Sequence, residues 1–408
     1  MLKYNKKISK RNKLFLGLFA IICIVLALLA YLKINTNLED KILKFEKEKQ
    51  VADIEIEEFI FDKERFLKEA SLPIEPIFDP PPPPDIDRMK RSGCVTDGIL
   101  TGYGGGSEEE IANLISRSNC YYLHRSIETW LEPPDFEEVE EMMEKINKDD
   151  VVYGMFIAEA IDTKADYYYD ARDRDFDFSR MCRGGSKNDW GEHTCKPTLE
   201  KKEYQRYVLD IVRNAIDLGV QSFMFGQVFY QDSISDPKID EVITRMKAYA
   251  KFKGVDIVIG AQTNDIEDEN YLRKFDFIEG GVGINRNGKI EEGPCFSRWW
   301  KKEGDWCWAL LWHDRFYKKA NNVFTHLDWS GVKGDDMSIF ANMSREKREE
   351  TLRYLDKYFE KKNVGFLMPM VTVLPKENGG CHGDSRKYYT SDNKYSCRDE
   401  GVINELLK

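Results

Sequence analysis

The sequence predicts an α/β fold, a closed (β/α)8 (TIM) barrel whose parallel strands alternate with helices that cover them. Short and almost wholly apolar runs recur along the chain, for example at 220–230 (VQSFMFGQVFY) and 255–264 (VDIVIGAQTN). Amphipathic segments such as 203–219 separate these runs. This alternation is typical of a parallel sheet covered on its outer face. Eight such units fit between residues 93 and 375, as a closed barrel requires.

The elements can be placed in order along the chain. Eight strands are expected at 98–106, 120–130, 151–160, 220–230, 255–264, 275–281, 322–331 and 364–370. Seven helices alternate with them, one that begins at Ser107 and others at 135–148, 203–219, 237–252, 268–274, 306–319 and 345–362. Ser107 and Glu110 form a capping box, Pro133 and Pro134 open the second helix, and a glycine ends the third. A long insertion, 161–200, follows strand three.

An open, doubly wound sheet is the alternative architecture. Such a sheet usually carries a G-x-G-x-x-G turn after its first strand. The corresponding segment here, GYGGGS at 102–107, does not match that pattern. The closed barrel is therefore the favoured prediction.

The first 92 residues are predicted to lie outside the barrel. Residues 1–13 carry six basic groups and no acid, and residues 14–32 (LFLGLFAIICIVLALLAYL) are 19 uncharged positions. A helix of about 20 apolar residues crosses a bilayer, and a basic flank stays in the cytoplasm. We therefore expect a single-pass signal anchor in the lipid bilayer, with the rest of the chain outside the cytoplasm; a cleaved signal peptide is the alternative. Residues 33–92 form a stem with a proline-rich linker.

Net charge and cysteine usage exclude some partners. The formal net charge is −11, and a body this acidic repels a phosphate backbone, so no nucleic-acid partner is expected. Eight of the nine cysteines follow the apolar segment, and an even number in an exported chain favours disulfides. Neighbouring cysteines are expected to pair in sequence, as Cys94–Cys120, Cys182–Cys195, Cys295–Cys307 and Cys381–Cys397, the last within a tail at 376–408. Zinc is the competing interpretation, but no C-x-x-C spacing occurs and the chain has only five histidines. Neither a metal nor a cofactor is expected.

Functional side chains are expected at the carboxyl ends of the strands, where the active sites of such barrels lie. Phe324, His326 and Asp328 share one face of strand seven, because side chains alternate along a strand. The ends of the other strands complete a ring of carboxylate, amide and basic side chains, namely His124, Arg125, Glu159, Gln227, Gln262, Asn264 and Glu279. A mouth lined in this way resembles the barrels of glycoside hydrolases. The resemblance covers residues 93–375, rests on architecture and residue types, and points to no specific family.

The resemblance implies that two carboxyl groups cleave a glycosidic bond, one as the acid and the other as the nucleophile or as the base for water. Asp328 is the expected nucleophile or base, with Glu159 or Glu279 as the acid. Each of these carboxylates could instead serve in an ion pair with a basic residue at the rim. Substrate binding is expected of His326, His124, Arg125, Gln227, Gln262 and Asn264. Indole rings pack on the C–H faces of sugars, so Trp299, Trp300 and Trp329 are stacking candidates.

The sequence therefore predicts a membrane-anchored glycoside hydrolase that acts outside the cytoplasm on a polysaccharide or another glycan. Two other classes of protein stay open. A barrel that binds glycan without cutting it would suit the glutamine at the end of strand four. A metal-dependent hydrolase is disfavoured, because no His-x-His or His-x-x-x-His pair occurs.

Overall fold

The computed structural model describes residues 80–102, 107–291, 309–328, 335–374, 381, 388–393 and 397–407. The chain divides into two compact units, Met1–Ser71 and Leu72–Lys408, and every described residue belongs to the second. The predicted anchor at 14–32 and most of the predicted stem lie outside the described residues. Among the helices that are described, none combines the length and the apolar character needed to cross a membrane.

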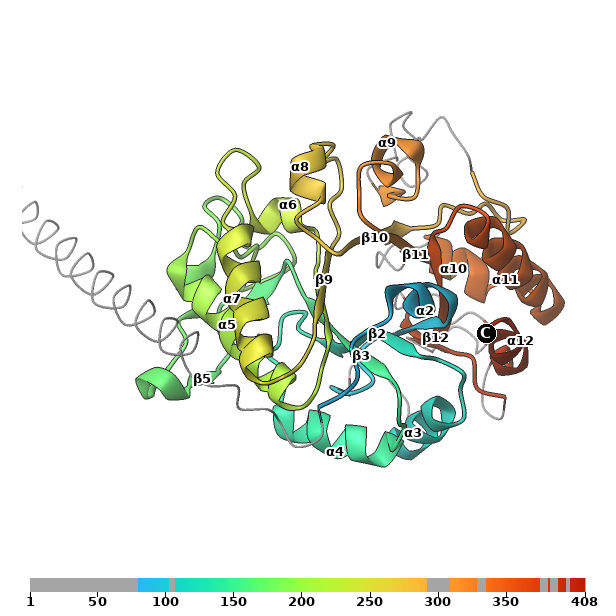
Figure 1. The fold of residues 1–408 in the computed structure, drawn as a ribbon, viewed down its shortest axis with the longest axis horizontal. Coiled ribbons are helices and arrows are strands. Elements are labelled where there is room, and N and C mark those ends of the chain that lie inside the picture. Colours follow the sequence, from blue (N-terminus) through green and yellow to red (C-terminus); the bar gives the residue numbers. More distant parts are fainter. Residues whose placement is uncertain are drawn as a thin grey trace, which may run out of the picture. The chain divides into compact units, whose positions relative to one another are not determined.

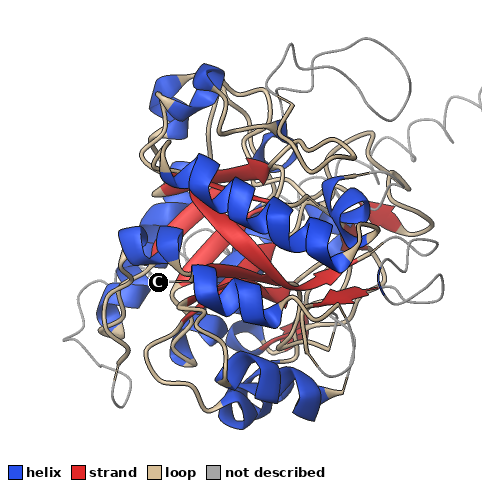
Figure 2. Ribbon diagram, turned by 90° about the vertical axis from the view of Figure 1, so that its right-hand side faces the viewer, coloured by secondary structure: helices blue, strands red, loops and turns tan. Residues whose placement is uncertain are grey.

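Eight parallel strands close into a barrel, as the sequence predicted. They follow the order β1–β2–β3–β8–β9–β10–β11–β12, and β12 pairs back onto β1. Their bounds are β1 Gly93–Thr96, β2 Tyr122–Glu128, β3 Val152–Ile157, β8 Ser222–Phe225, β9 Val258–Ala261, β10 Phe277–Gly281, β11 Val323–His326 and β12 Gly365–Val373. A further strand, β13 (Tyr388–Thr390), pairs antiparallel with the end of β12. Figure 2 shows the strands crossing the centre of the molecule with helices around them.

Helices cover the outside of this barrel, and capping side chains fix where several of them begin. The principal helices are α3 Glu108–Ser116, α4 Phe136–Ile146, α5 Lys202–Asp217, α7 Ile239–Phe252, α8 Glu269–Leu272, α10 Asp336–Ala341, α11 Arg345–Glu360 and α12 Glu400–Leu406. The predicted cap at Ser107 is confirmed, since its side chain accepts a hydrogen bond from the Glu110 amide. Asp135 caps α4 in the same way. Figure 1 shows α5 and α7 side by side on one flank, where they pack against each other.

Two predicted elements differ in the structure. The first strand is Gly93–Thr96 rather than 98–106. Gly98 takes a left-handed conformation at φ +60°, which ends the strand, and its amide donates to the Arg125 carbonyl. Of the helix expected at 306–319, the described part contains only α9 (Asp314–Tyr317), which starts where the His313 ring accepts a hydrogen bond from the Arg315 amide.

A short helix closes the amino-terminal end of the barrel. α2 (Ile86–Arg91) begins at Asp85, whose side chain accepts a hydrogen bond from the backbone, and it packs against β1 and β12. Its Met89 is fully buried in the inner core of the barrel. The proline run before it also contacts the barrel, since Gln221 Nε2 donates to the Pro82 carbonyl at 2.8 Å. The packed unit thus begins before residue 93, where the sequence placed the start of the barrel.

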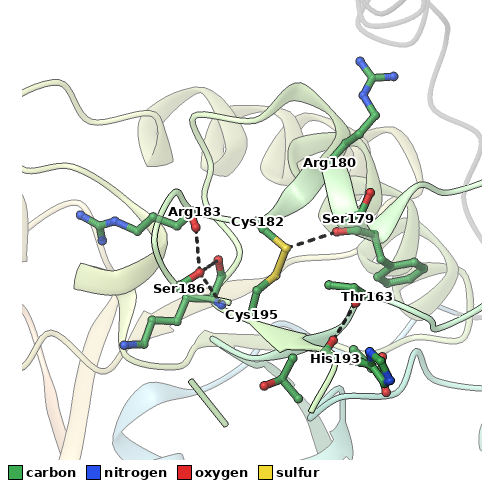
Figure 3. Close-up of a disulfide and its surroundings, with 12 residues drawn as sticks. Thr163, Ser179, Arg180, Cys182, Arg183, Ser186, His193 and Cys195 are labelled. Atoms are coloured by element: carbon green, nitrogen blue, oxygen red, sulfur yellow. Dashed lines mark hydrogen bonds between the residues drawn. A yellow bond between two sulfur atoms is a disulfide. The ribbon is translucent and has the colours of Figure 1, made fainter. Parts of the chain in front are cut away.

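Three of the predicted disulfides are present, Cys94–Cys120, Cys182–Cys195 and Cys381–Cys397. The fourth pair, Cys295–Cys307, falls outside the described residues and stays a prediction that non-reducing peptide mapping can check. Cys182–Cys195 closes part of the insertion 161–200. Around it, the Thr163 hydroxyl donates to the His193 carbonyl and the Ser186 hydroxyl to the Arg183 carbonyl, each at 2.8 Å (Figure 3). The disulfides are typical of a protein domain that folds outside the reducing cytoplasm.

Candidate functional site

The site is built on strands whose lower residues form the inner core of the barrel. Tyr122, Phe277 and Phe324 are buried together there, and the Phe324 ring lies edge-on to the other two. Side chains two residues further along a strand point to the same face, toward the carboxyl end. Those residues are His124, Glu279 and His326, all of them predicted site residues. The packing of the three aromatic rings in the inner core therefore directs the three polar side chains above them into the barrel.

His124, Glu279 and His326 converge inside the carboxyl end of the barrel. One nitrogen of each imidazole and one oxygen of the carboxylate lie within 4.8 Å of one another, and all three residues are buried. Glu279 Oε1 and His326 Nε2 are in ion-pair contact. The other carboxylate oxygen, Oε2, accepts a hydrogen bond from Gln262 Nε2 at 3.1 Å. Two imidazoles and a carboxylate are donor types that bind transition metals, although the sequence predicted no metal.

The electrostatics of this cluster give its members different charges. Burial alone would raise the pKa of Glu279, but the adjacent His326 overcomes that effect and holds it at about 2. Burial likewise opposes the charge on His326, yet the Glu279 carboxylate raises its pKa to about 9. Burial lowers the pKa of His124 to about 3. At neutral pH the cluster therefore holds one carboxylate, one imidazolium and one neutral imidazole.

Arg125 forms ion pairs with two buried acids, Asp97 and Glu128. It sits at φ +59°, where the pairing register of β2 with β3 shifts, so it turns inward beside His124. Its Nε lies 2.7 Å from Glu128 Oε1 and 3.5 Å from Asp97 Oδ1, and its guanidinium stacks over the Phe156 ring at 4.0 Å. Burial raises the pKa of Glu128 to about 7 and also raises that of Asp97, against the opposing effect of Arg125. The sequence offered Arg125 as a substrate-binding group and gave no role to Asp97 or Glu128.

The predicted residues Glu159, Gln227, Asn264 and Gln262 form a second group. Gln227 Nε2 donates to Glu159 Oε1, and Asn264 Nδ2 donates to Gln227 Oε1 at 3.2 Å. Gln262 links this group to the cluster of His124, Glu279 and His326. Its Oε1 accepts a hydrogen bond from the backbone amide of Gln227 at 3.4 Å, and its Nε2 donates one to Glu279. Glu159 Oε2 is buried and meets no hydrogen-bond partner in the described part of the chain. Burial raises the pKa of Glu159.

Glycine is required beside Glu159. A Cβ at Gly226 would lie 2.4 Å from Glu159 Oε2 and 2.3 Å from the Phe156 ring. The chain just after β8 therefore has room for the Glu159 carboxyl group only because residue 226 is a glycine, without a side chain. The FGQVF sequence that ends this strand is explained by that close approach.

Asp328 follows β11 and is only partly buried. Its Cβ would lie 3.1 Å from a Cβ placed on Gly281, at the end of the neighbouring strand β10. Burial raises the pKa of its carboxyl group to about 7, with the His326 charge acting in the opposite direction. The structure therefore puts Asp328 at the rim above the cluster of His124, Glu279 and His326.

The insertion 161–200 contributes two side chains to the site that the sequence did not single out, Trp190 and Lys196. Trp190, from the disulfide-bonded insertion, meets Trp130 edge-on with ring centroids 5.3 Å apart, and it is 40% exposed. Lys196, from the same insertion, lies over the Tyr230 ring at 3.9 Å and acts electrostatically on Glu159. The predicted stacking residues Trp299, Trp300 and Trp329 fall outside the described residues. No local signal pointed to Trp190, because only the folded insertion brings it to the barrel.

The fold and this site define a (β/α)8 barrel with a polar cluster inside its carboxyl end, the architecture of the glycoside hydrolases that the sequence resembled. No family model matches the chain, and no curated protein matches its sequence. Solved structures of similar fold include a GH27 β-L-arabinopyranosidase from Geobacillus stearothermophilus, at 10% identity and a TM-score of 0.42, over 78% of this chain and 78% of its own. An α-galactosidase from Thermus thermophilus matches at 11% identity and a TM-score of 0.43, over 81% of this chain and 66% of its own. An α-amylase from Malbranchea cinnamomea matches at 9% identity and a TM-score of 0.42, over 80% of this chain and 77% of its own.

Proposed function

We propose that this chain is a glycoside hydrolase in which Glu159 is the general acid and Asp328 is the nucleophile or the base for water. The observation that carries the proposal is the state of Glu159, a buried carboxyl group with one oxygen held by Gln227 and the other without a hydrogen-bond partner among the described residues. Burial favours its protonated form, and a protonated carboxyl group at the mouth is what a leaving glycosidic oxygen needs.

The second carboxyl group of the proposal stands on another strand. Asp328 follows β11 and Glu159 follows β3, and in the order of strands β3 and β11 are separated by β8, β9 and β10. Two carboxyl groups on well-separated strands face a ligand in the mouth from different directions. Glycosidic cleavage requires such an arrangement, with the acid on the leaving group and its partner on the anomeric carbon or its water.

Glu279, the third predicted catalytic residue, takes a supporting role in this proposal. It is fully buried, and its two oxygens face His326 and Gln262. It therefore lies below the rim and holds its neighbours in place. Gln227, Gln262 and Asn264 remain the proposed substrate-binding amides, with Trp190 added as a partly exposed ring for sugar stacking.

The proposed substrate is a polysaccharide or another glycan outside the cytoplasm. The disulfides of the described part support that compartment. A single-pass anchor at 14–32 with a cytoplasmic amino terminus remains part of the proposal and rests on the sequence alone.

Hydrolysis by the purified full-length chain tests the proposal. A panel of aryl glycosides and soluble polysaccharides should give reducing-sugar release that Glu159→Gln lowers by 10²- to 10⁴-fold, the range of a lost general acid. Asp265→Asn is the matched control, since Asp265 is an exposed acid after β9 that should leave turnover unchanged. Equal rates for Glu159→Gln and the parent chain would remove Glu159 from the mechanism.

Glycan binding without cleavage is the second candidate function. Gln227 favours binding without cleavage, because the side chain that follows β8 is an amide rather than a second carboxyl group, and it donates a hydrogen bond to Glu159. Saturable binding of a glycan that the chain never hydrolyses would support this candidate over the first.

A further inference from the structure

We propose that His124, Glu279 and His326 bind a divalent transition-metal ion inside the carboxyl end of the barrel. The three residues come from three different strands, β2, β10 and β11. Their potential ligand atoms lie within 4.8 Å of one another, and each residue is at most 2% exposed. Burial of three such groups is costly unless they are partnered, so their convergence needs a cause.

Each side chain has its outer atom fixed by a hydrogen bond. His326 Nδ1 lies 3.0 Å from the Leu327 carbonyl, so Nδ1 carries a proton and donates it. Glu279 Oε2 accepts from Gln262, and His124 Nδ1 lies 2.8 Å from the Tyr122 hydroxyl. Metal-binding histidines and carboxylates are oriented in this way by the groups behind them.

The inner atoms of the same side chains converge. His124 Nε2, Glu279 Oε1 and His326 Nε2 are buried and form no hydrogen bond of good geometry with the described residues. Glu279 Oε1 and His326 Nε2 nevertheless touch as an ion pair. A metal ion would take the place of the proton between them: His326 Nε2 releases that proton to solvent and then donates its lone pair to the ion.

The donor set selects the class of ion. Two imidazoles and one carboxylate suit zinc and the other late first-row divalent ions, whereas calcium and magnesium prefer sites made of oxygen ligands. Three protein ligands leave a coordination position for water or for a ligand in the mouth. The structure therefore assigns a zinc-class ion to this cluster.

Tyr122 is the proposed positioning residue for His124. A metal on Nε2 requires the proton of His124 to stand on Nδ1, from which it can be donated to the Tyr122 oxygen. That oxygen also accepts a hydrogen bond from the Ser222 hydroxyl at 3.1 Å, which fixes its place. Removing the hydroxyl should weaken the site without removing a ligand.

Metal uptake by the full-length chain tests the proposal in the absence of any glycan. The chain is stripped with a chelator, equilibrated with Zn²⁺ or Co²⁺ and desalted, and its metal content is measured by mass spectrometry. We expect about one ion per chain, visible d–d absorption bands for the Co²⁺ form, and a higher melting temperature with Zn²⁺ than with chelator. A parent chain that takes up no ion and gives no Co²⁺ spectrum overturns the proposal, whatever the variants do.

Variants locate the ion. His326→Gln and Glu279→Gln should each weaken Zn²⁺ binding by at least about 100-fold, and Tyr122→Phe by about 10- to 100-fold, as lost outer partners do. His193→Gln is the matched control, because His193 lies in the insertion and should keep parental affinity. The assignment would also be overturned if His193→Gln abolished uptake. The same holds if His326→Gln and Glu279→Gln both bound Zn²⁺ with parental affinity.

The two proposals can fail separately. A chain that binds one Zn²⁺ but cleaves no glycan contradicts the proposed hydrolase and leaves the metal site standing. A chain that cleaves glycan equally well with chelator and takes up no ion contradicts only the metal site.

Discussion

Arg174 forms two hydrogen bonds with the carboxylate of Glu203, from Nη1 to Oε1 at 2.7 Å and from Nη2 to Oε2 at 2.8 Å. Arg174 belongs to the insertion 161–200, and Glu203 lies in the first turn of α5 on the outside of the barrel. The Asp177 amide also donates to Glu203 Oε1, at 2.9 Å. This contact attaches the insertion, and with it Trp190 and Lys196, to the barrel.

The first prediction is that acid weakens this attachment. Burial would raise the pKa of Glu203, but the bonds from Arg174 and Asp177 outweigh it and hold the pKa below its usual value. A depressed pKa stabilises the folded state above the unfolded pKa, about 4.3, and that stability is lost as pH falls through the folded value. Arg174→Gln should cost about 2 kcal/mol at pH 7, and its thermal melts should depend less on pH below about 4.5 than those of the parent.

The control for that experiment is Arg286→Gln, because Arg286 is an exposed basic residue away from the insertion. Its melting temperature should follow the parent from pH 7 to pH 3. If Arg174→Gln also follows the parent throughout, the bidentate contact does not hold the insertion.

The second prediction concerns the buried charge of Arg125. Arg125→Met leaves Asp97 and Glu128 buried without their cation, and losing one partner of a buried pair typically costs about 3–5 kcal/mol. Met and Arg both carry a Cβ and are equally unfavourable in the left-handed conformation at φ +59°, so the substitution leaves the backbone strain unchanged. Urea unfolding should show that Arg125→Met/Glu128→Gln recovers part of the loss. A double variant as unstable as the sum of both single variants would mean that Arg125 and Glu128 are not coupled.

The third prediction is that α2 is part of the barrel. Met89 is fully buried, so Met89→Ala in the full-length chain should lower the free energy of unfolding by about 2–5 kcal/mol. Ile234→Ala is the control, since Ile234 is 50% exposed and should cost little. Equal denaturant midpoints for both variants would place α2 with the stem, as the sequence alone did.

Sequence patterns predicted the barrel because strands and helices leave periodic signals, and they predicted the inward direction of His326 because alternation follows from Phe324. They did not predict the cluster of His124, Glu279 and His326. Its members lie on strands far apart in the chain, so no short histidine spacing reveals them. The same patterns placed Arg125 in the mouth but missed its two buried acids, Asp97 after β1 and Glu128 at the end of β2, because a local shift in the register of β2 brings the three together. They also missed Trp190, which reaches the barrel only through a folded insertion.

The last prediction separates the chemical role of Asp328 from a structural one. Asp328→Asn keeps the shape of the side chain but removes the charge that a nucleophile or base requires. Turnover should fall by several powers of ten, as for other essential carboxylates. The melting temperature should change little, because the carboxylate of Asp328 is partly exposed and accepts no hydrogen bond from the described residues. If Asp328 instead held a structural ion pair, the variant would lose several degrees of melting temperature and keep its turnover. A thermal melt and a hydrolysis assay on the same sample distinguish the two, and undiminished turnover would leave Glu159 without Asp328 as its partner.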